Sequence, residues 1–249
     1  MTEGSERLYE TDAYLRDFEA RVLAADGQRV LLDRTAFYPG GGGQPCDKGG
    51  LIHHGIVHGV ADVRKRDGGI WHTVLGTPLP NGATVLGHID WTRRYALMRT
   101  HTALHMLSAV VFRDHGRLVT GGDMQPLNGR LDFDMERLDL EIATAIEARL
   151  NQEVAAARPV RVAILPREEA FKIPDLIRTK VNLLPEGILF VRTVEIFGLD
   201  LQADGGTHVA NTREVGRVKL VGYESKGRRN KRLRIELEPA LSAAIAPAS

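Results

Sequence analysis

The spacing of apolar residues predicts a first part of the chain made of short strands. Between residues 17 and 90, glycine and proline separate short apolar runs, which is typical of strands joined by tight turns. Asp26-Gly27, between the first two runs, is a hairpin signal. The strands expected here lie at 21–23, 29–32, 50–52, 55–57, 71–74 and 84–86. Many short strands of this kind favour a small barrel or a sandwich.

The pattern changes near Asp90, where apolar residues begin to recur mostly at intervals of three and four. This periodicity predicts a long amphipathic helix over 91–112, capped by Asp90 or Thr92. Gly116, and then Gly121-Gly122, break the helical pattern. A second helix is expected over 138–157, where apolar residues again recur at helical spacing.

Alternating strands are expected around and beyond the second helix. They lie at 130–134, 160–164, 190–196, 216–221 and 232–237. Alternation of this kind suits an antiparallel sheet with one face in water. We therefore predict an α+β protein, with a small β-barrel-like domain over 1–91 and an α/β two-layer domain with an antiparallel sheet over 92–249.

Composition adds little to this picture, except near the C-terminus. The chain of 249 residues is 43% hydrophobic and 26% charged, which is ordinary for a globular protein and argues against wholesale disorder. A net charge of +1 does not by itself indicate a nucleic-acid binder. Six basic residues nevertheless crowd into one short segment: Lys226, Arg228, Arg229, Lys231, Arg232 and Arg234. This run is either a solvated strand or a contact for phosphates.

Cysteine usage and the N-terminal segment point to a cellular compartment. Cys46 is the single cysteine, so no intrachain disulfide can form, which suits a reducing cytosol. The first residues are polar and acidic and do not resemble a secretory signal, and no apolar run has the length of a membrane span. We expect a cytoplasmic protein with no membrane partner. Its oligomeric state is left open, and a monomer is compatible with the sequence.

Two stretches carry candidate metal ligands. His101 and His105 are four residues apart, so a helix places both imidazoles on one face. Asp204-Gly205-Gly206-Thr207-His208 adds a carboxylate and a third imidazole at the same spacing. The alternative is that His101 and His105 are unrelated, one packed and one solvated. Five other histidines show no ligand spacing and are interpreted as surface or strand residues: His53, His54, His58, His72 and His88.

The donor types of this set indicate zinc. Zinc accepts imidazole nitrogen and carboxylate oxygen, and a catalytic zinc keeps one position open for water or substrate. Thr102 follows the first histidine where a zinc protease helix has the Glu that acts as general base, so a protease is disfavoured. No Ser/His/Asp arrangement is legible, and we predict no catalytic residue beyond the metal site.

Two glycine-rich segments are candidate binding elements. Gly40 to Gly43 form a run of four, and such a run loses much entropy on folding. It is either a flexible loop or a segment that lets a ligand approach the backbone closely. No Gly-Lys-Ser/Thr follows, so it is not a Walker loop. Gly205-Gly206 either forms a tight turn that places His208 or presents backbone N–H groups to an anion, and the two roles are compatible.

These motifs together resemble the free-standing alanyl-tRNA editing proteins, relatives of the editing domain of alanyl-tRNA synthetase. Their pattern is a helical His-x-x-x-His followed far downstream by Cys-Gly-Gly-Thr-His, which 101–105 and 204–208 match except that Asp204 replaces the cysteine. Phe37-Tyr38-Pro39, 41–45 and Asp47 resemble the glycine-rich signature of the longer members, which carry an N-terminal β-domain. The resemblance spans nearly the whole chain and makes 92–249 the expected editing domain.

The resemblance implies a zinc-dependent aminoacyl-tRNA deacylase, a carboxylic ester hydrolase that acts in trans on mischarged tRNA(Ala). The substrate is chiefly Ser-tRNA(Ala) and sometimes Gly-tRNA(Ala). The metal ligands would be His101, His105, Asp204 and His208, or the three histidines alone. The expected substrate-binding residues are Thr102 and Gln44, as polar contacts, with Gly41, Gly42, Gly43, Gly205 and Gly206. The alternatives are editing of Ser-tRNA(Thr), a non-catalytic tRNA-binding module with a decayed metal site, and a generic metal-dependent hydrolase of small esters or amides.

Overall fold

The computed structural model describes residues 4–179 and 187–239, and within these ranges the chain forms two compact units. The first unit comprises Met1–Met98 with Gly205–Thr207, and the second comprises Arg99–Asp204 with His208–Ser249. The division falls inside helix α1 (Trp91–His115), which is one continuous element. The domain boundary predicted between residues 91 and 92 stays a prediction.

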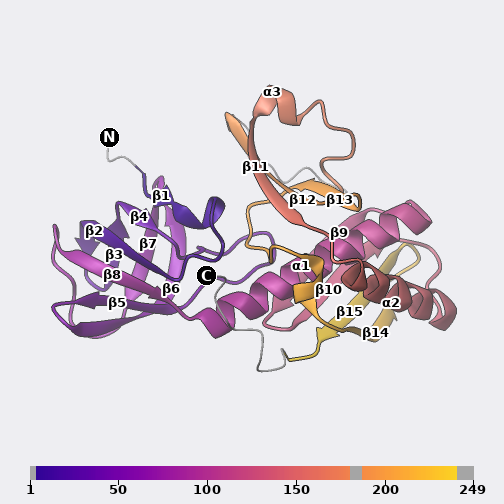
Figure 1. Cartoon of the computed structure of the whole chain (residues 1–249), viewed down its shortest axis with the longest axis horizontal. Helices are drawn as coiled ribbons and strands as arrows, with labels where there is room; N and C mark the ends of the chain where they lie inside the picture. The colour runs from indigo at the N-terminus through magenta and orange to yellow at the C-terminus, as the bar shows by residue number, and fades with distance from the viewer. Residues whose placement is uncertain (1–3, 180–186, 240–249) are drawn as a thin grey trace. The chain divides into compact units, whose positions relative to one another are not determined.

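The first unit is built around a closed antiparallel barrel, with strand order β2-β3-β7-β6-β5-β8 (Figure 1). Its strands are β2 (Asp17–Asp26), β3 (Arg29–Leu32), β5 (Gly49–His53), β6 (Ile56–Arg66), β7 (Gly69–Val74) and β8 (Thr84–Ile89). A short parallel pair, β1 (Glu6–Arg7) and β4 (Arg34–Thr35), and the 3-10 turn η1 (Leu8–Glu10) accompany it. The predicted barrel is confirmed, because alternate residues such as Phe18 and Val22 fill one interior.

Two details of the barrel differ from the sequence prediction. The first hairpin pairs Asp26 with Arg29, so the turn is Gly27-Gln28, and Asp26 belongs to the strand. Gly27 supplies the positive φ of 59° that the first turn position needs. The short strand expected at 55–57 is part of β6, which continues to Arg66 through polar residues that apolar spacing does not reveal. His72 lies in a strand as expected, but its imidazole is buried in the barrel.

Helix α1 confirms the predicted helix and extends it to His115. The side chain of Asp90 accepts a hydrogen bond from the backbone N–H of Arg93 at 3.1 Å, so Asp90 rather than Thr92 caps the helix. The stretch from Leu97 to Val111 is buried almost throughout. A helix that is buried on most of its faces shows weak amphipathicity. Its many apolar residues nevertheless allow the helix to be predicted from the sequence.

In the second unit, α1 packs on an antiparallel sheet with strand order β14-β15-β10-β9 (Figure 1). The strands are β9 (Val119–Gln125), β10 (Asn128–Asp134), β14 (Val218–Ser225) and β15 (Asn230–Leu237). The contact is close at Gly129, where an added Cβ would lie 3.1 Å from Leu104 of the helix. The predicted break in the helical pattern is confirmed, because α1 ends at His115, directly before Gly116, and Gly121 and Gly122 lie in β9. Gly122 leaves room for Leu131 of the paired strand.

Helix α2 (Leu140–Ala155) confirms the second predicted helix. Asp139 caps it by accepting a hydrogen bond from Ile142 N at 3.0 Å. Two side chains tie the helix to β14: Asn151 bonds both backbone groups of Val218, and Glu147 accepts from Leu220 N at 2.8 Å. The helix therefore meets the sheet through polar anchors as well as through its apolar face.

A smaller antiparallel sheet has the strand order β11-β12-β13, and its last strand ends directly before the stretch that contains Asp204 and His208. Its elements are β11 (Val160–Pro166), β12 (Phe190–Ile196) and β13 (Asp200–Ala203), with the short helix α3 (Arg167–Ala170) after β11 and the 3-10 turn η2 (Thr212–Val215) beyond. β12 was predicted with these bounds, whereas β13 is too short and polar to be visible as a strand.

The predicted α+β class is confirmed, with a closed barrel followed by an α/β region of mostly antiparallel sheets. Among the described residues, no helix is both long and apolar enough to cross a membrane.

Candidate metal centre

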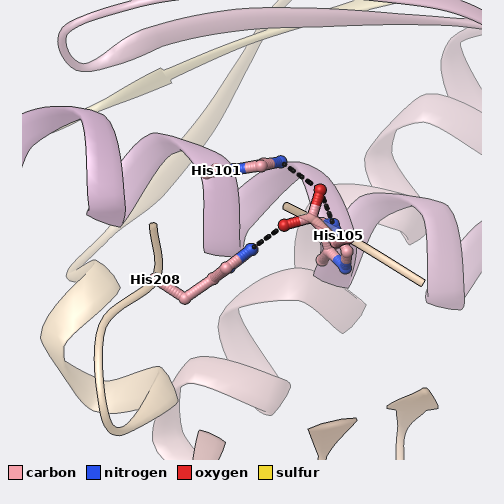
Figure 2. A group of neighbouring side chains, drawn as sticks. His101, His105 and His208 are labelled. Atoms are coloured by element: carbon pink, nitrogen blue, oxygen red, sulfur yellow. Dashed lines mark hydrogen bonds and ion pairs between the residues drawn. The ribbon is translucent and has the colours of Figure 1, made fainter. Parts of the chain in front are cut away.

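Four side chains meet at one buried point of the second unit. His101 and His105 come from α1, and Asp204 and His208 follow β13. One ligand atom from each of the four lies within 4.8 Å of the others. His208 Nε2 is 3.0 Å from Asp204 Oδ2, and His101 Nε2 and His105 Nε2 are 3.6 and 4.0 Å from Asp204 Oδ1. Figure 2 shows the labelled side chains of His101, His105 and His208 lying close together.

The two pairs reach the same point by different means. His101 and His105 use helical spacing, which separates their ring centroids by 5.1 Å. Asp204 and His208 lie in an irregular segment, so their proximity depends on a turn and not on a helix. The ring of His208 packs against both others, with centroids 4.3 Å from His101 and 4.7 Å from His105. The sequence-predicted ligand set is thus brought together.

Burial controls the protonation of the cluster. Removal from water lowers the pKa of His101 well below its ordinary value, and lowers that of His208 to about 4, so both rings are neutral at pH 7. Burial alone would raise the pKa of Asp204, but its interactions with His101, His208 and His105, including the hydrogen bond with His208, hold it well below its usual range. Burial likewise opposes charge on His105, but Asp200 and Asp204 raise its pKa.

These residues fit a divalent metal ion. Two neutral imidazoles and an ionised carboxylate are ready to donate lone pairs without releasing protons. Ligand atoms bound tetrahedrally at about 2.0–2.1 Å lie roughly 3.3 Å apart, and the observed separations from Asp204 are 3.0 to 4.0 Å. The cluster can therefore hold a metal ion after small side-chain movements.

Thr102 contacts His208, one of the four residues of the cluster. It is fully buried, and its Oγ1 lies 3.1 Å from His208 Nδ1 and accepts from Val209 N at 3.3 Å. An imidazole that keeps Nε2 free for a metal carries its proton on Nδ1, and Thr102 Oγ1 is placed to accept it. Thr102, which was predicted from the sequence as a substrate contact, thus also contacts His208, a predicted metal ligand.

Two charged residues at the centre were missed in the sequence. Arg192 Nη1 donates to the backbone oxygen of Asp204 at 2.9 Å and lies 3.8 Å from its Oδ2. Asp200 accepts from His105 Nδ1 at 3.2 Å. Neither stands at a ligand spacing from the histidines. The one available signal was the position of Arg192 in the strand, between Val191 and Thr193, both of which are buried.

The glycine run forms a tight hairpin in the first unit. Gly41 and Gln44 exchange backbone hydrogen bonds of 3.0 and 2.9 Å around Gly42 and Gly43. The φ angles of these two are 58° and 88°, as a type I′ turn requires. Gly41, Gly42 and Gly43 are exposed. The alternative of a merely flexible loop is therefore replaced by an ordered turn whose tip carries no side chains.

Gln44 is buried and holds the segment Gly205–Thr207, which belongs to the same unit. Its Nε2 donates to Thr207 Oγ1 at 2.9 Å, and its Oε1 accepts from Thr207 N at 3.1 Å. Gly205 is exposed and Gly206 is buried. Gln44 of the first motif thus contacts Thr207 of the second, a residue that the sequence did not single out.

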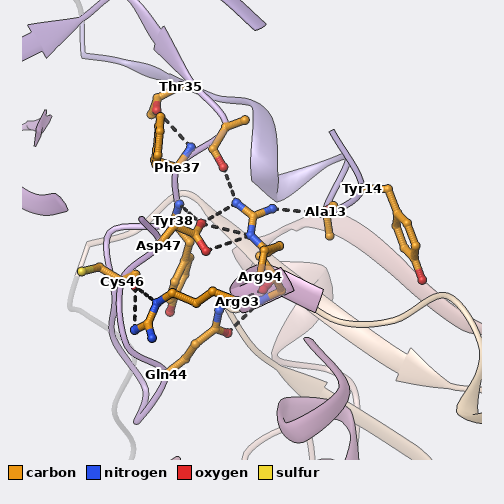
Figure 3. Close-up of polar contacts among 12 residues, drawn as sticks. Ala13, Tyr14, Thr35, Phe37, Tyr38, Gln44, Cys46, Asp47, Arg93 and Arg94 are labelled. Atoms are coloured by element: carbon orange, nitrogen blue, oxygen red, sulfur yellow. Dashed lines mark hydrogen bonds and ion pairs between the residues drawn. The ribbon is translucent and has the colours of Figure 1, made fainter. Parts of the chain in front are cut away.

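A buried ion pair fixes the base of the glycine hairpin (Figure 3). Arg94, in the first turn of α1, binds the carboxylate of Asp47, and neither side chain is more than 1% exposed. Arg94 also donates to the backbone oxygens of Ala13 and Ala36, and Asp47 accepts from Tyr38 N. The start of α1 and both ends of the glycine motif are therefore held at one point.

The basic segment near the C-terminus is largely neutralised. Arg232 pairs with Asp132 at 2.7 Å, and Arg229 pairs with Asp134 at 3.2 Å. Glu224 binds both Lys226 and Arg234. Lys231 is buried, and its Nζ donates to backbone oxygens of the preceding turn. These contacts favour a structural role for the run over a phosphate contact.

Known proteins resemble the chain over nearly all its length. An alanyl-tRNA editing protein AlaX-M of Saccharolobus solfataricus is 40% identical over 94% of this chain and 100% of its own, and one of Methanosarcina barkeri is 38% identical over 92% and 97%. The alanine–tRNA ligase of Pyrobaculum neutrophilum is 38% identical over 87% of this chain and 25% of the ligase.

Two family models match separate parts of the chain. The model of class II (A) tRNA synthetases matches residues 11–93, which include the barrel and the glycine hairpin. The model of the second additional domain of threonyl and alanyl tRNA synthetases matches residues 191–234, which include Asp204 and His208. Together with the relatives of similar length, these matches show that the chain belongs to the family of alanyl-tRNA editing proteins.

Proposed function

We propose that this chain is a trans-editing hydrolase that deacylates mischarged tRNA(Ala), chiefly Ser-tRNA(Ala) and also Gly-tRNA(Ala). The main support for the proposal is the buried cluster formed in a member of this family by His101, His105, Asp204 and His208. The proposal includes an N-terminal β-rich domain over 1–91 and an editing domain over 92–249. It takes these four residues as ligands of a zinc ion.

The need for such an enzyme is physical. An alanine-binding pocket rejects an isostere that merely adds a hydroxyl, or a smaller side chain, only weakly, so a second site must remove the errors. The second site must bind serine better than alanine. A buried polar group that pairs with the serine hydroxyl does this, because alanine leaves that group without a partner.

The cluster provides the reactive part of the proposed site. When bound, zinc supplies an electropositive centre that polarises or positions the aminoacyl ester for attack by water. The four side chains hold the ion in a setting that is nearly closed to solvent, where charges interact more strongly than in water. Thr102 orients His208, and Arg192 fixes the backbone at Asp204, so the donor atoms stay in place during hydrolysis.

We also propose Thr102, Gln44 and the glycines of both motifs as substrate-binding residues: Gly41, Gly42, Gly43, Gly205 and Gly206. The exposed tip of the hairpin, with no side chains, would let a sugar–phosphate backbone approach closely. The contact of Thr102 with His208 supports a positioning role beside the predicted substrate contact.

The test is metal analysis combined with deacylation by the purified protein. We expect about one zinc per chain and hydrolysis of Ser-tRNA(Ala) and Gly-tRNA(Ala), with Ala-tRNA(Ala) spared. His101→Ala and His208→Ala should abolish both zinc binding and hydrolysis in a folded protein. His115→Ala, at the other end of the same helix, is the matched control and should leave both intact.

Other outcomes would replace the proposal by a named alternative. Preference for Ser-tRNA(Thr) would assign the chain to threonine editing. Binding of tRNA without metal or hydrolysis would indicate a binding module, and hydrolysis of small esters or amides without tRNA would indicate a generic hydrolase.

A further inference from the structure

Asp200 is a buried carboxylate that faces three donors. It opens strand β13, and its side chain is 0% exposed. His105 Nδ1 and Gln202 Nε2 lie 3.2 and 2.7 Å from its Oδ2, and Arg178 Nη1 lies 2.6 Å from its Oδ1. The guanidinium of Arg178 faces Oδ1, and the side-chain amide of Gln202 donates to Oδ2, so both oxygens of the carboxyl group meet donors. Asp200 therefore acts only as an acceptor.

The contact with Asp200 decides which nitrogen of His105 carries the proton. Because both oxygens of Asp200 face other donors, Oδ2 accepts from His105, and the hydrogen bond requires the proton on Nδ1. In the neutral ring that can bind a metal, the lone pair then lies on Nε2, which is the nitrogen that faces Asp204 at 4.0 Å. In the opposite tautomer, Nδ1 and Asp200 would place two acceptors against each other in a buried site.

Arg178 links this contact back to the helix that carries the histidine. Its guanidinium lies 4.6 Å from the ring centroid of Phe112, seven residues after His105 and thus on the same face of α1. The sequence of contacts runs from Phe112 through Arg178 and Asp200 to His105. This arrangement fixes Asp200 independently of any metal.

We propose that Asp200 is a positioning residue of the metal centre, which holds His105 as the Nδ1–H tautomer and aims Nε2 at the ion. The metal-binding part of this inference rests on the proposed function, whereas the tautomer does not. Outer partners that orient a ligating imidazole in this way raise metal affinity by about 10–100-fold.

Two measurements on the full-length protein test this role. Zinc affinity is measured by competition with a chromogenic chelator, and the tautomer of His105 by ¹⁵N NMR of the metal-free protein. Asp200→Ala should weaken zinc binding by about 10–100-fold, and the ¹⁵N shifts should show that Nδ1–H is no longer the dominant form. Asp200→Asn, which keeps the shape and one acceptor oxygen, should fall between Asp200→Ala and the wild type. Glu195→Gln removes a carboxylate from the adjacent strand and is the matched control, expected to change neither quantity.

The outcomes separate this inference from the proposed function. If the wild type binds zinc and Asp200→Asn matches it in affinity and tautomer, the positioning role is refuted while the metal site stands. If the wild type binds no zinc, the tautomer spectra alone decide, and an Nε2–H form of His105 overturns the inference. Should Asp200→Ala fail to fold, the same readings are taken from Asp200→Asn and from Arg178→Gln, which leaves Asp200 in place without its cation.

Discussion

Gln44 and Thr207, which lie 163 positions apart in the chain, share two hydrogen bonds of 2.9 and 3.1 Å. Both residues are almost wholly buried. The side-chain amide of Gln44 therefore binds the segment between Asp204 and His208 through both the backbone N–H and the side-chain hydroxyl of Thr207. Gln44, which belongs to the glycine motif, thus helps to hold the segment that precedes His208.

Replacing Gln44 by Ala should loosen the 205–207 segment. The buried N–H of Thr207 would lose its acceptor, which costs about 1–3 kcal/mol. Because Asp204 and His208 flank this segment directly, we expect weaker zinc binding and slower deacylation. Chelator competition and Ser-tRNA(Ala) hydrolysis measure these effects. Gln44→Glu keeps the acceptor and should be milder, whereas equal effects of the two variants would contradict the account.

Replacing Asp204 by Cys tests whether this position binds the metal. Thiolate is a softer ligand than carboxylate, so the variant should bind zinc at least as tightly as the wild type. Loading both proteins with Co²⁺ gives a direct reading, because a thiolate on cobalt produces a charge-transfer absorption that a carboxylate does not. Absence of that band in a cobalt-loaded Asp204→Cys protein would place residue 204 outside the ligand set and leave a three-histidine site.

Thr102→Val removes a hydroxyl while keeping the shape of the side chain. His208 Nδ1 and Val209 N would both lose their contact, so we expect zinc affinity to fall by about tenfold or more. Thr102→Ser should restore most of it. A different pattern, in which Thr102→Val keeps zinc affinity but loses discrimination between seryl and alanyl esters, would assign Thr102 to substrate recognition alone.

His72 predicts a loss of stability in mild acid. Burial lowers its pKa to about 4, whereas in the unfolded chain it titrates near 6.5. Below pH 6.5 the unfolded state therefore binds the proton first, and stability falls with pH until about 4. Between pH 7.5 and 5 this contributes about 2 kcal/mol.

Urea unfolding at the two pH values measures this effect. His72→Gln should show a smaller difference between pH 7.5 and 5 than the wild type, even if it is less stable at both. His54→Asn is the control, because His54 is exposed and its left-handed backbone tolerates asparagine. An unchanged pH difference in His72→Gln would show that His72 is not the responsible group.

Breaking the Arg94–Asp47 pair should destabilise the first unit strongly. Arg94→Met leaves the buried carboxylate of Asp47 without its cation, which costs about 3–5 kcal/mol. Asp47→Asn in the same chain should recover part of this loss, since the amide oxygen still accepts from Tyr38 N. A double-mutant cycle by thermal or urea unfolding gives the coupling, and simple additivity would refute it.

Local patterns account for most of the elements and for the four candidate ligands. The helical spacing of His101 and His105 places their rings together. Short apolar runs between glycines and prolines predicted the barrel strands, and alternation predicted β12. The missed features depend on partners far along the chain. β9 is a strand because β10 pairs with its glycines, and Asp200 is revealed only by the side chain that it meets across the fold.

At Gly42, in the tip of the glycine hairpin, the backbone conformation restricts the choice of residue more than the space available for a side chain does. Nothing lies within 4 Å of where a Cβ at Gly42 would stand, yet its φ of 58° disfavours most L side chains. A D-alanine there would meet no such penalty, although it carries the same methyl group as L-alanine. Gly42 thus acts as a mirror-image residue in an L chain, and chirality alone can explain why glycine stands there.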